Sequence, residues 1–182
     1  MARVLVPLAE GCEELEAVTI IDLLRRAGVE VVVAGLKSGI VKASRGTQLM
    51  PDTTLDAALQ DEYDMVVLPG GMPGAQHLKD DARVVAFVQK MATAGRFTAA
   101  ICAAPTVLAA AGVLEGKTAT SYPGFLDKMH LPNVTLSTEA IVRDGLVITS
   151  RGPGTAMDFA LSLVEILMGL ETRHQVESSL VR

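Results

Sequence analysis

Nearly continuous apolar runs alternate along this chain with longer segments that have the apolar period of a helix. The runs at 29–36 (VEVVVAGL) and 63–71 (YDMVVLPGG) are typical of strands buried on both faces of a parallel sheet. The segment 9–28 (AEGCEELEAVTIIDLLRRAG) has apolar side chains every three or four residues, which predicts a helix that ends at Gly28. Its apolar stripe consists of Ala17, Ile20, Ile21, Leu24 and Ala27.

The remaining pattern predicts further strands and helices in alternation. We expect strands at 3–8 and 96–102, a hairpin at 37–50, helices at 79–94 and 103–112, weaker strands at 117–121, 134–137, 139–143 and 146–150, and two C-terminal helices separated by Gly169. Because no repeat or linker interrupts the alternation, the sequence predicts one α/β domain over 1–182, with a mainly parallel sheet and helices on both faces.

Parallel sheets of this kind bind their ligands beyond the carboxyl ends of the strands. Four segments of the chain follow predicted strands directly and are expected at that edge. They are 10–16, 69–74, 102–105 and 150–155.

Composition narrows the classes of partner. The chain has 182 residues, of which 49% are hydrophobic and only 3% aromatic, with a net charge of −5. No basic run is present, so we expect neither sequence-specific nucleic-acid binding nor attachment to an acidic membrane. The uncharged stretch at 98–114 contains Pro105 and is better explained as a strand that leads into a helix than as a membrane span. Two cysteines and no signal-peptide pattern favour a soluble cytoplasmic protein.

Cys102 is the first candidate for chemistry. It lies where a predicted strand meets a predicted helix, between small neighbours and before Pro105. A thiol at a helix N-terminus has a lowered pKa and is a better nucleophile. The alternative is an ordinary buried cysteine, and this segment alone leaves both interpretations open.

Glu16 is the second candidate, because it lies four residues before Ile20 and continues the apolar stripe of the first helix. A carboxyl group turned into a core has a raised pKa and can act as a proton donor near neutral pH. Alternatively the stripe ends before this position, and Glu16 reaches water beside Glu13 and Glu14. The helical period does not decide between the two.

The turn after the strand at 63–71 contains Gly70 and Gly71, whose N–H groups could line an oxyanion pocket or simply form a tight turn. Neither a dinucleotide-binding fingerprint nor a P-loop is present, so no nucleotide cofactor is expected. The three histidines have no metal-ligand spacing with the cysteines, so no metal is expected either. Redox pairing of Cys12 with Cys102 remains an option, since both follow strands.

Four motifs occur together in register: EGCEELEAVTIIDLLRRAG, YDMVVLPGG, AAICAAPT and TSRGPGTAMDFAL. In this order and spacing they resemble the ThiJ/PfpI superfamily, in its DJ-one clade, over nearly the whole chain. The resemblance implies a flavodoxin-like three-layer sandwich and a homodimer. It assigns the nucleophile to Cys102, the protonated glutamate to Glu16, and the backbone N–H donors to Gly70, Gly71 and Ala103. It also places Glu13, Asp22, Arg26 and Arg45 near the dimer-side mouth of the pocket.

The resemblance implies a glyoxalase that needs no glutathione, or a deglycase for protein and nucleotide adducts of methylglyoxal and glyoxal. The resemblance also implies an alternative function as a redox-responsive sensor or holdase chaperone, in which the same cysteine is oxidised. Tyr122 stands where human-type members have histidine, so the predicted proton shuttle is Glu16. Ala103 after the nucleophile argues against the peptidase branch, and the spacing of HQVE at 174–177 argues against class I amidotransferases.

Overall fold

The computed structural model describes residues 1–182, and its centre is a seven-stranded sheet. All neighbouring strands in this sheet are parallel except β10 and β11, which are antiparallel. In spatial order the strands are β10 (Ile141–Asp144), β11 (Val147–Ser150), β7 (Phe97–Ile101), β6 (Met65–Leu68), β1 (Arg3–Leu8), β2 (Glu30–Gly35) and β5 (Thr53–Thr54). The predicted mainly parallel sheet is confirmed.

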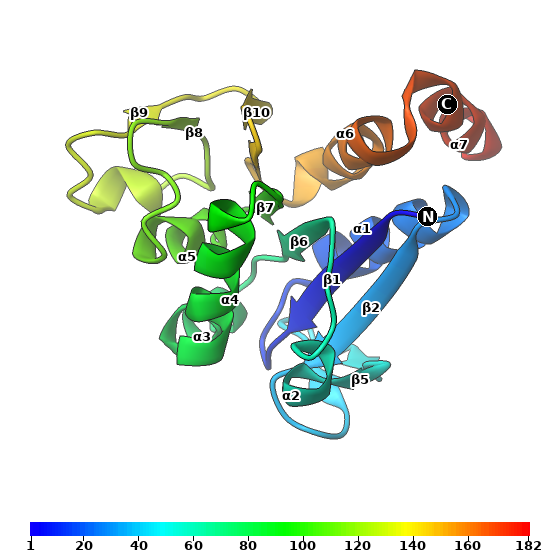
Figure 1. Ribbon diagram of the computed structural model, residues 1–182, viewed down its shortest axis with the longest axis horizontal. Coiled ribbons are helices and arrows are strands. Elements are labelled where there is room, and N and C mark those ends of the chain that lie inside the picture. The colour runs from blue at the N-terminus through cyan, green and yellow to red at the C-terminus, as the bar shows by residue number, and fades with distance from the viewer.

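Helices cover both faces of this sheet. On one side, α1 (Glu14–Arg26) packs against α6 (Ala156–Met168), and α7 (Leu170–Ser179) packs on α6. The other side carries α3 (Gly74–Asp80), α4 (Ala82–Thr93) and α5 (Pro105–Ala110), which contact one another (Figure 1). The molecule is therefore a flavodoxin-like three-layer α/β sandwich, as expected.

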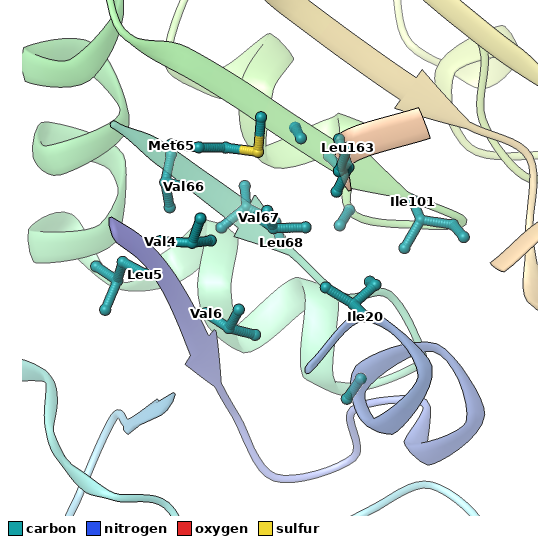
Figure 2. Close-up of a cluster of buried hydrophobic side chains, with 14 of the residues drawn as sticks. Val4, Leu5, Val6, Ile20, Met65, Val66, Val67, Leu68, Ile101 and Leu163 are labelled. Carbon is teal, nitrogen blue, oxygen red and sulfur yellow. The ribbon is translucent and has the colours of Figure 1, made fainter. Parts of the chain in front are cut away.

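The core consists of aliphatic side chains from the central strands and the inner faces of the helices. Fifty-one buried apolar residues form one cluster. Ile20 of α1 and Leu163 of α6 lie over the strands that carry Val6 and Val67 (Figure 2). Strands buried on both faces need apolar side chains at every position, which is why the runs along β1 and β6 are continuous rather than alternating.

Several element boundaries differ from the prediction. The helix expected at 79–94 is two helices, because Asp81 has an extended backbone and its side chain accepts a hydrogen bond from the Arg83 N–H, which caps α4. The sequence pattern missed α2 (Leu55–Ala58).

The weaker strands predicted at 139–143 and 146–150 are β10 and β11 of the main sheet, whereas the other weak strands and the hairpin form two small sheets beside it. The hairpin at 37–50 is the antiparallel pair β3 (Val41–Lys42) and β4 (Gln48–Leu49). The strands expected near 117–121 and 134–137 shorten to the parallel pair β8 (Thr118–Ala119) and β9 (Thr135–Leu136). Single turns of 3-10 helix lie at Leu126–Lys128 and Pro153–Thr155. None of the helices is both long enough and apolar enough to span a bilayer.

Candidate active site

The carboxyl ends of β1, β6 and β7 meet at one edge of the sheet, and each is followed by a candidate residue. α1 starts soon after β1 and carries Glu16 in its first turn, while Gly70 and Cys102 follow β6 and β7. The chain leaves β1 towards one face of the sheet and β6 towards the other (Figure 1). This change of face between neighbouring strands is where open α/β sheets form their binding crevice.

The backbone holds Cys102 in a strained conformation. Its φ of 64° lies in the left-handed region, which residues other than glycine rarely adopt. The Cys102 N–H donates to the carbonyl of Ser150 at 3.0 Å, and its own carbonyl accepts from the Tyr122 N–H at 2.8 Å. These bonds from two other segments fix a sharp turn between β7 and α5, which is the geometry of a nucleophile elbow.

Glu16 is fully buried, so the alternative in which it reaches water is wrong. Its Oε2 accepts a hydrogen bond from the Gly70 N–H at 2.8 Å, its carboxyl group bonds with the Cys102 thiol, and its Oε1 has no partner. Desolvation raises the pKa of Glu16 to about 7, against the opposing effect of the Gly70 and Cys102 hydrogen bonds. The carboxyl group therefore changes protonation near neutral pH.

Burial raises the pKa of Cys102 to about 12, and the charge of an ionised Glu16 acts in the same direction. The lowered pKa expected from the sequence is therefore wrong. The helix that was expected to lower it, α5, has only six residues and begins three positions beyond the thiol. Hydrogen bonds from the N–H groups of Gly71 and Ala103 to the sulfur oppose the rise.

The Gly-Gly turn is shaped by close approach to these two groups. A Cβ atom at Gly70 would lie 2.6 Å from the Cys102 Cβ and 2.9 Å from Glu16 Oε2, so only glycine fits there. Gly71 has a φ of 84° and its backbone contacts the Glu13 backbone. The sequence expectation needs one correction: the Gly70 N–H is already bonded to Glu16, which leaves Gly71 and Ala103 as the donors that face the sulfur.

Sequence reasoning missed the role of Glu14, which holds the β3–β4 hairpin against the start of α1. Its carboxylate accepts from the N–H of Arg45 at 3.0 Å and from the Ser44 hydroxyl at 3.1 Å. Desolvation acts to raise the pKa of Glu14, but these backbone and hydroxyl donors outweigh it and lower the pKa to about 2. Glu13 also accepts from Ser44, at 2.9 Å, so the hairpin is fixed beside Cys12 and the turn.

Among the other predicted pocket residues, only Tyr122 forms a hydrogen bond with the Cys102–Glu16 pair, through its backbone N–H. Asp22 and Arg26 pair with each other at 3.1 Å further along α1; at 1.5 Å per residue, Arg26 lies about 15 Å along the helix from Glu16. Arg45 is exposed on the hairpin. Tyr122 is 46% exposed and packs edge-on against Phe125. Their proximity to the pocket stays a prediction.

The second cysteine, Cys12, is buried and forms no disulfide. Desolvation, reinforced by the charge of Glu14, raises the pKa of Cys12 to about 12. Both cysteines are free thiols. No three His, Cys, Asp or Glu side chains lie close enough together to hold a metal ion.

The raised pKa of Glu16 predicts a pH-dependent stability. The folded protein holds this proton up to about pH 7, whereas the ordinary value is 4.5. Between these values the folded state binds more protons than the unfolded state, so stability decreases as the pH rises. At about 1.36 kcal/mol per pH unit, the free energy of unfolding falls by about 3 kcal/mol across this window.

Urea unfolding of the wild type and of Glu16→Gln across this pH window measures the effect. The difference in unfolding free energy between the two proteins should change by about 3 kcal/mol, with the variant gaining relative stability as the pH rises. A constant difference would contradict a buried, titrating Glu16.

Comparison with known proteins places this chain in a family. The family model described as DJ-1/PfpI matches residues 2–166. Protein dj-1beta of Drosophila melanogaster is 45% identical, over 97% of this chain and 95% of its own. The Parkinson disease protein 7 homolog of Danio rerio is 47% identical, over 98% and 96%. A Caenorhabditis elegans relative named glutathione-independent glyoxalase DJR-1.2 is 35% identical, over 93% and 90%.

Solved structures agree with this placement. The crystal structure of Drosophila melanogaster DJ-1beta superposes with a TM-score of 0.95 at 44% identity, and covers 99% of this chain and 97% of that one. The structure of oxidized Toxoplasma gondii DJ-1 gives a TM-score of 0.94 at 39% identity, over 100% and 98%. With a matching family model, close relatives along nearly the full length and the same fold, the chain belongs to the DJ-1/PfpI family.

Proposed function

We propose that this protein is a cysteine-dependent glyoxalase that converts small 2-oxoaldehydes such as methylglyoxal to 2-hydroxy acids without glutathione. The observation that carries the proposal is the buried contact between the Glu16 carboxyl group and the Cys102 thiol, with two N–H groups directed at the sulfur. A family relative bears the name glutathione-independent glyoxalase, which supports this class of reaction.

Glu16 and Cys102 act as a pair that shares one proton. After burial, the charge of an ionised Glu16 is the second largest cause of the raised Cys102 pKa. When Glu16 is protonated, this charge is absent and the Cys102 pKa is lower. A protonated Glu16 beside a thiolate carries the same total charge as an ionised Glu16 beside a thiol, so the two forms interconvert without exchange with solvent. The reactive form is the thiolate with the protonated carboxyl group.

The reaction needs no external oxidant or reductant. The thiolate adds to the aldehyde carbon, and Glu16 supplies a proton to the oxygen, which gives a hemithioacetal. Glu16, now ionised, moves a proton from that carbon to the adjacent carbonyl carbon, and the hydroxyl proton passes to the former carbonyl oxygen through an enediol, which turns the hemithioacetal into a thioester of the 2-hydroxy acid. Water then hydrolyses the thioester and returns the thiol. The N–H groups of Gly71 and Ala103 are placed to stabilise negative charge on oxygen, at about 3 kcal/mol for each donor.

The direct test is an assay of purified protein with methylglyoxal in the absence of any thiol cofactor. We expect loss of methylglyoxal to be matched by formation of lactate over many turnovers per protein molecule. Methylglyoxal loss without lactate would mean that the protein is only modified by the aldehyde, and would overturn the proposal.

Deglycation of protein and nucleotide adducts is proposed as a second use of the same chemistry, since a hemiaminal carbon is open to the same thiolate attack. An excess of an unrelated aldehyde scavenger separates direct action from removal of free aldehyde. If adduct is lost no faster with the protein than with the scavenger alone, the protein acts only on free aldehyde.

An oxidation sensor, with holdase activity in the oxidised form, is the second candidate. The observation that favours it is the unpartnered Oε1 of Glu16 beside a sulfur that already has two N–H donors, because sulfinate oxygens need such partners. Intact mass after mild peroxide tests it: a sensor gains two oxygens at Cys102 and changes its binding of unfolded clients, whereas a pure catalyst only loses activity.

We also propose a homodimer that acts in the cytoplasm, where free thiols persist. Leu15 and Val18 on α1 and Met50 after the hairpin are exposed apolar side chains that a second copy would cover. A partner on this face would bring cationic side chains such as Arg26 and Arg45 towards the mouth of the neighbouring pocket. Sedimentation or light scattering decides the oligomeric state.

A further inference from the structure

Arg151, in the segment 150–155 between β11 and α6, has no partner for its guanidinium group. It is half-buried, and no hydrogen bond or ion pair involves its side chain. Eight of the other arginines make such contacts, and Arg45, which makes none, is exposed. A desolvated, unpaired cation is costly, so Arg151 is poised to accept an anion.

A cavity of about 170 Å³ lies against this side chain. One of its walls is Thr120, which is 1% exposed and whose Oγ1 has no hydrogen-bond partner. This hydroxyl lies behind the wall of the cavity and is not itself exposed in it. Hydroxyl groups of Ser121, Ser137 and Thr138 also line the cavity.

One acidic residue, Asp127, lines the cavity as well. Its carboxylate accepts a hydrogen bond from the Gly124 N–H at 2.7 Å, and it forms no ion pair with Arg151. Because Asp127 is exposed, water screens its charge more strongly than that of the half-buried Arg151. Arg151 is therefore the dominant charge of the cavity, beside residues that carry hydroxyl groups.

Two segments beside the cavity are joined to Cys102 by backbone hydrogen bonds. Arg151 follows Ser150, whose carbonyl accepts from the Cys102 N–H at 3.0 Å. Tyr122, which lines the same cavity, donates its N–H to the Cys102 carbonyl at 2.8 Å. A ligand here lies against the same two segments that hold the Cys102 backbone.

We propose that this cavity binds the carboxylate of a small 2-hydroxy acid, the product of the proposed reaction. The guanidinium fork matches a carboxylate, and Ser137 and Thr138, which also line the cavity, carry hydroxyl groups that can bond the neighbouring hydroxyl of the ligand. The volume is below that of pockets for drug-sized ligands, which start near roughly 300 Å³, but holds a molecule of a few heavy atoms. Methylglyoxal is uncharged, so the site distinguishes product from substrate by charge. The assignment as a product site rests on the proposed function.

Titration of lactate into the Cys102→Ser protein, followed by NMR or calorimetry, tests the site without turnover. We expect saturable binding that weakens about tenfold or more in an added Arg151→Gln change and about threefold in Thr138→Val. Lys128→Gln is the matched control: it removes a nearby positive charge that does not line the cavity, and lactate affinity should stay the same. Thermal unfolding of each variant checks that it is folded.

Absence of saturable lactate binding, or equal affinity in Arg151→Gln and its parent, would overturn the proposal. Equal binding of inorganic phosphate would overturn the assignment to a carboxylate. In the active protein, lactate should inhibit methylglyoxal turnover, and Arg151→Gln should relieve that inhibition. If lactate binds as expected but the active protein forms none from methylglyoxal, the carboxylate site stands while the glyoxalase function and the product assignment fail.

Discussion

Replacement of Cys102 by serine is expected to lower kcat/KM for methylglyoxal by about 10³-fold or more. A serine hydroxyl in the same buried position has a far higher pKa than a thiol, so Glu16 cannot convert it to the anion that attacks the aldehyde. The change is nearly isosteric and leaves the backbone bonds to Ser150 and Tyr122 in place. The fold should therefore survive while the first chemical step is lost. Steady-state assays of lactate formation measure the effect.

Cys12→Ser is the matched control for this variant. Cys12 is equally buried and follows another strand of the same sheet edge, but it has no contact with the Glu16 carboxyl group. Its activity should stay within about twofold of the wild type. Comparable losses in both variants would mean that the effect reflects packing, and a Cys102→Ser protein with full activity would remove Cys102 from the mechanism.

Glu16→Gln is the second large effect, with an expected loss of about 10²- to 10⁴-fold in kcat. The amide oxygen can still accept the Gly70 N–H, so the turn keeps its geometry, but an amide can neither take the thiol proton nor pass it between carbons. Substrate binding does not use this proton, so KM should change much less than kcat. Single-turnover measurements separate the two parameters.

Glu30→Gln provides the comparison for a lost carboxylate at the opposite edge of the sheet. Glu30 begins β2 and forms an exposed ion pair with Arg3, so its replacement should leave turnover unchanged. If Glu16→Gln keeps more than about a tenth of wild-type kcat, Glu16 is not the proton shuttle.

The fold was largely predictable because its core strands are buried on both faces. Continuous apolar runs such as Val31–Ala34 are compatible with few structures other than a strand buried on both faces. The helical period of α1 extends its apolar stripe as far as Glu16, which is buried. The division at Asp81 was not predictable from period, because a capping side chain inside an amphipathic stretch does not interrupt the apolar pattern.

The sequence predicted which residues form the site, but it did not predict the direction of the Cys102 pKa shift. Cys102, Glu16 and the Gly-Gly turn do converge, yet the direction of the Cys102 pKa depends on burial and on the nearby carboxylate, which only three dimensions reveal. The same holds for the Gly70 N–H, which is taken up by Glu16. The sequence placed the segment 150–155 at the ligand-binding edge of the sheet but did not single out Arg151, because the lack of a partner for its guanidinium group has no sequence signature.

The central claim is that Glu16 and Cys102 share a single proton. The rate of alkylation by iodoacetamide as a function of pH, in the Cys12→Ser protein so that only Cys102 reacts, tests it most directly. A shared proton predicts that the rate rises as the pair loses the first of its two protons, is half-maximal near pH 7, and then levels off while the second proton stays shared. A rate that climbs about tenfold per pH unit beyond about pH 9 without levelling is the behaviour of a lone buried thiol and would contradict the claim.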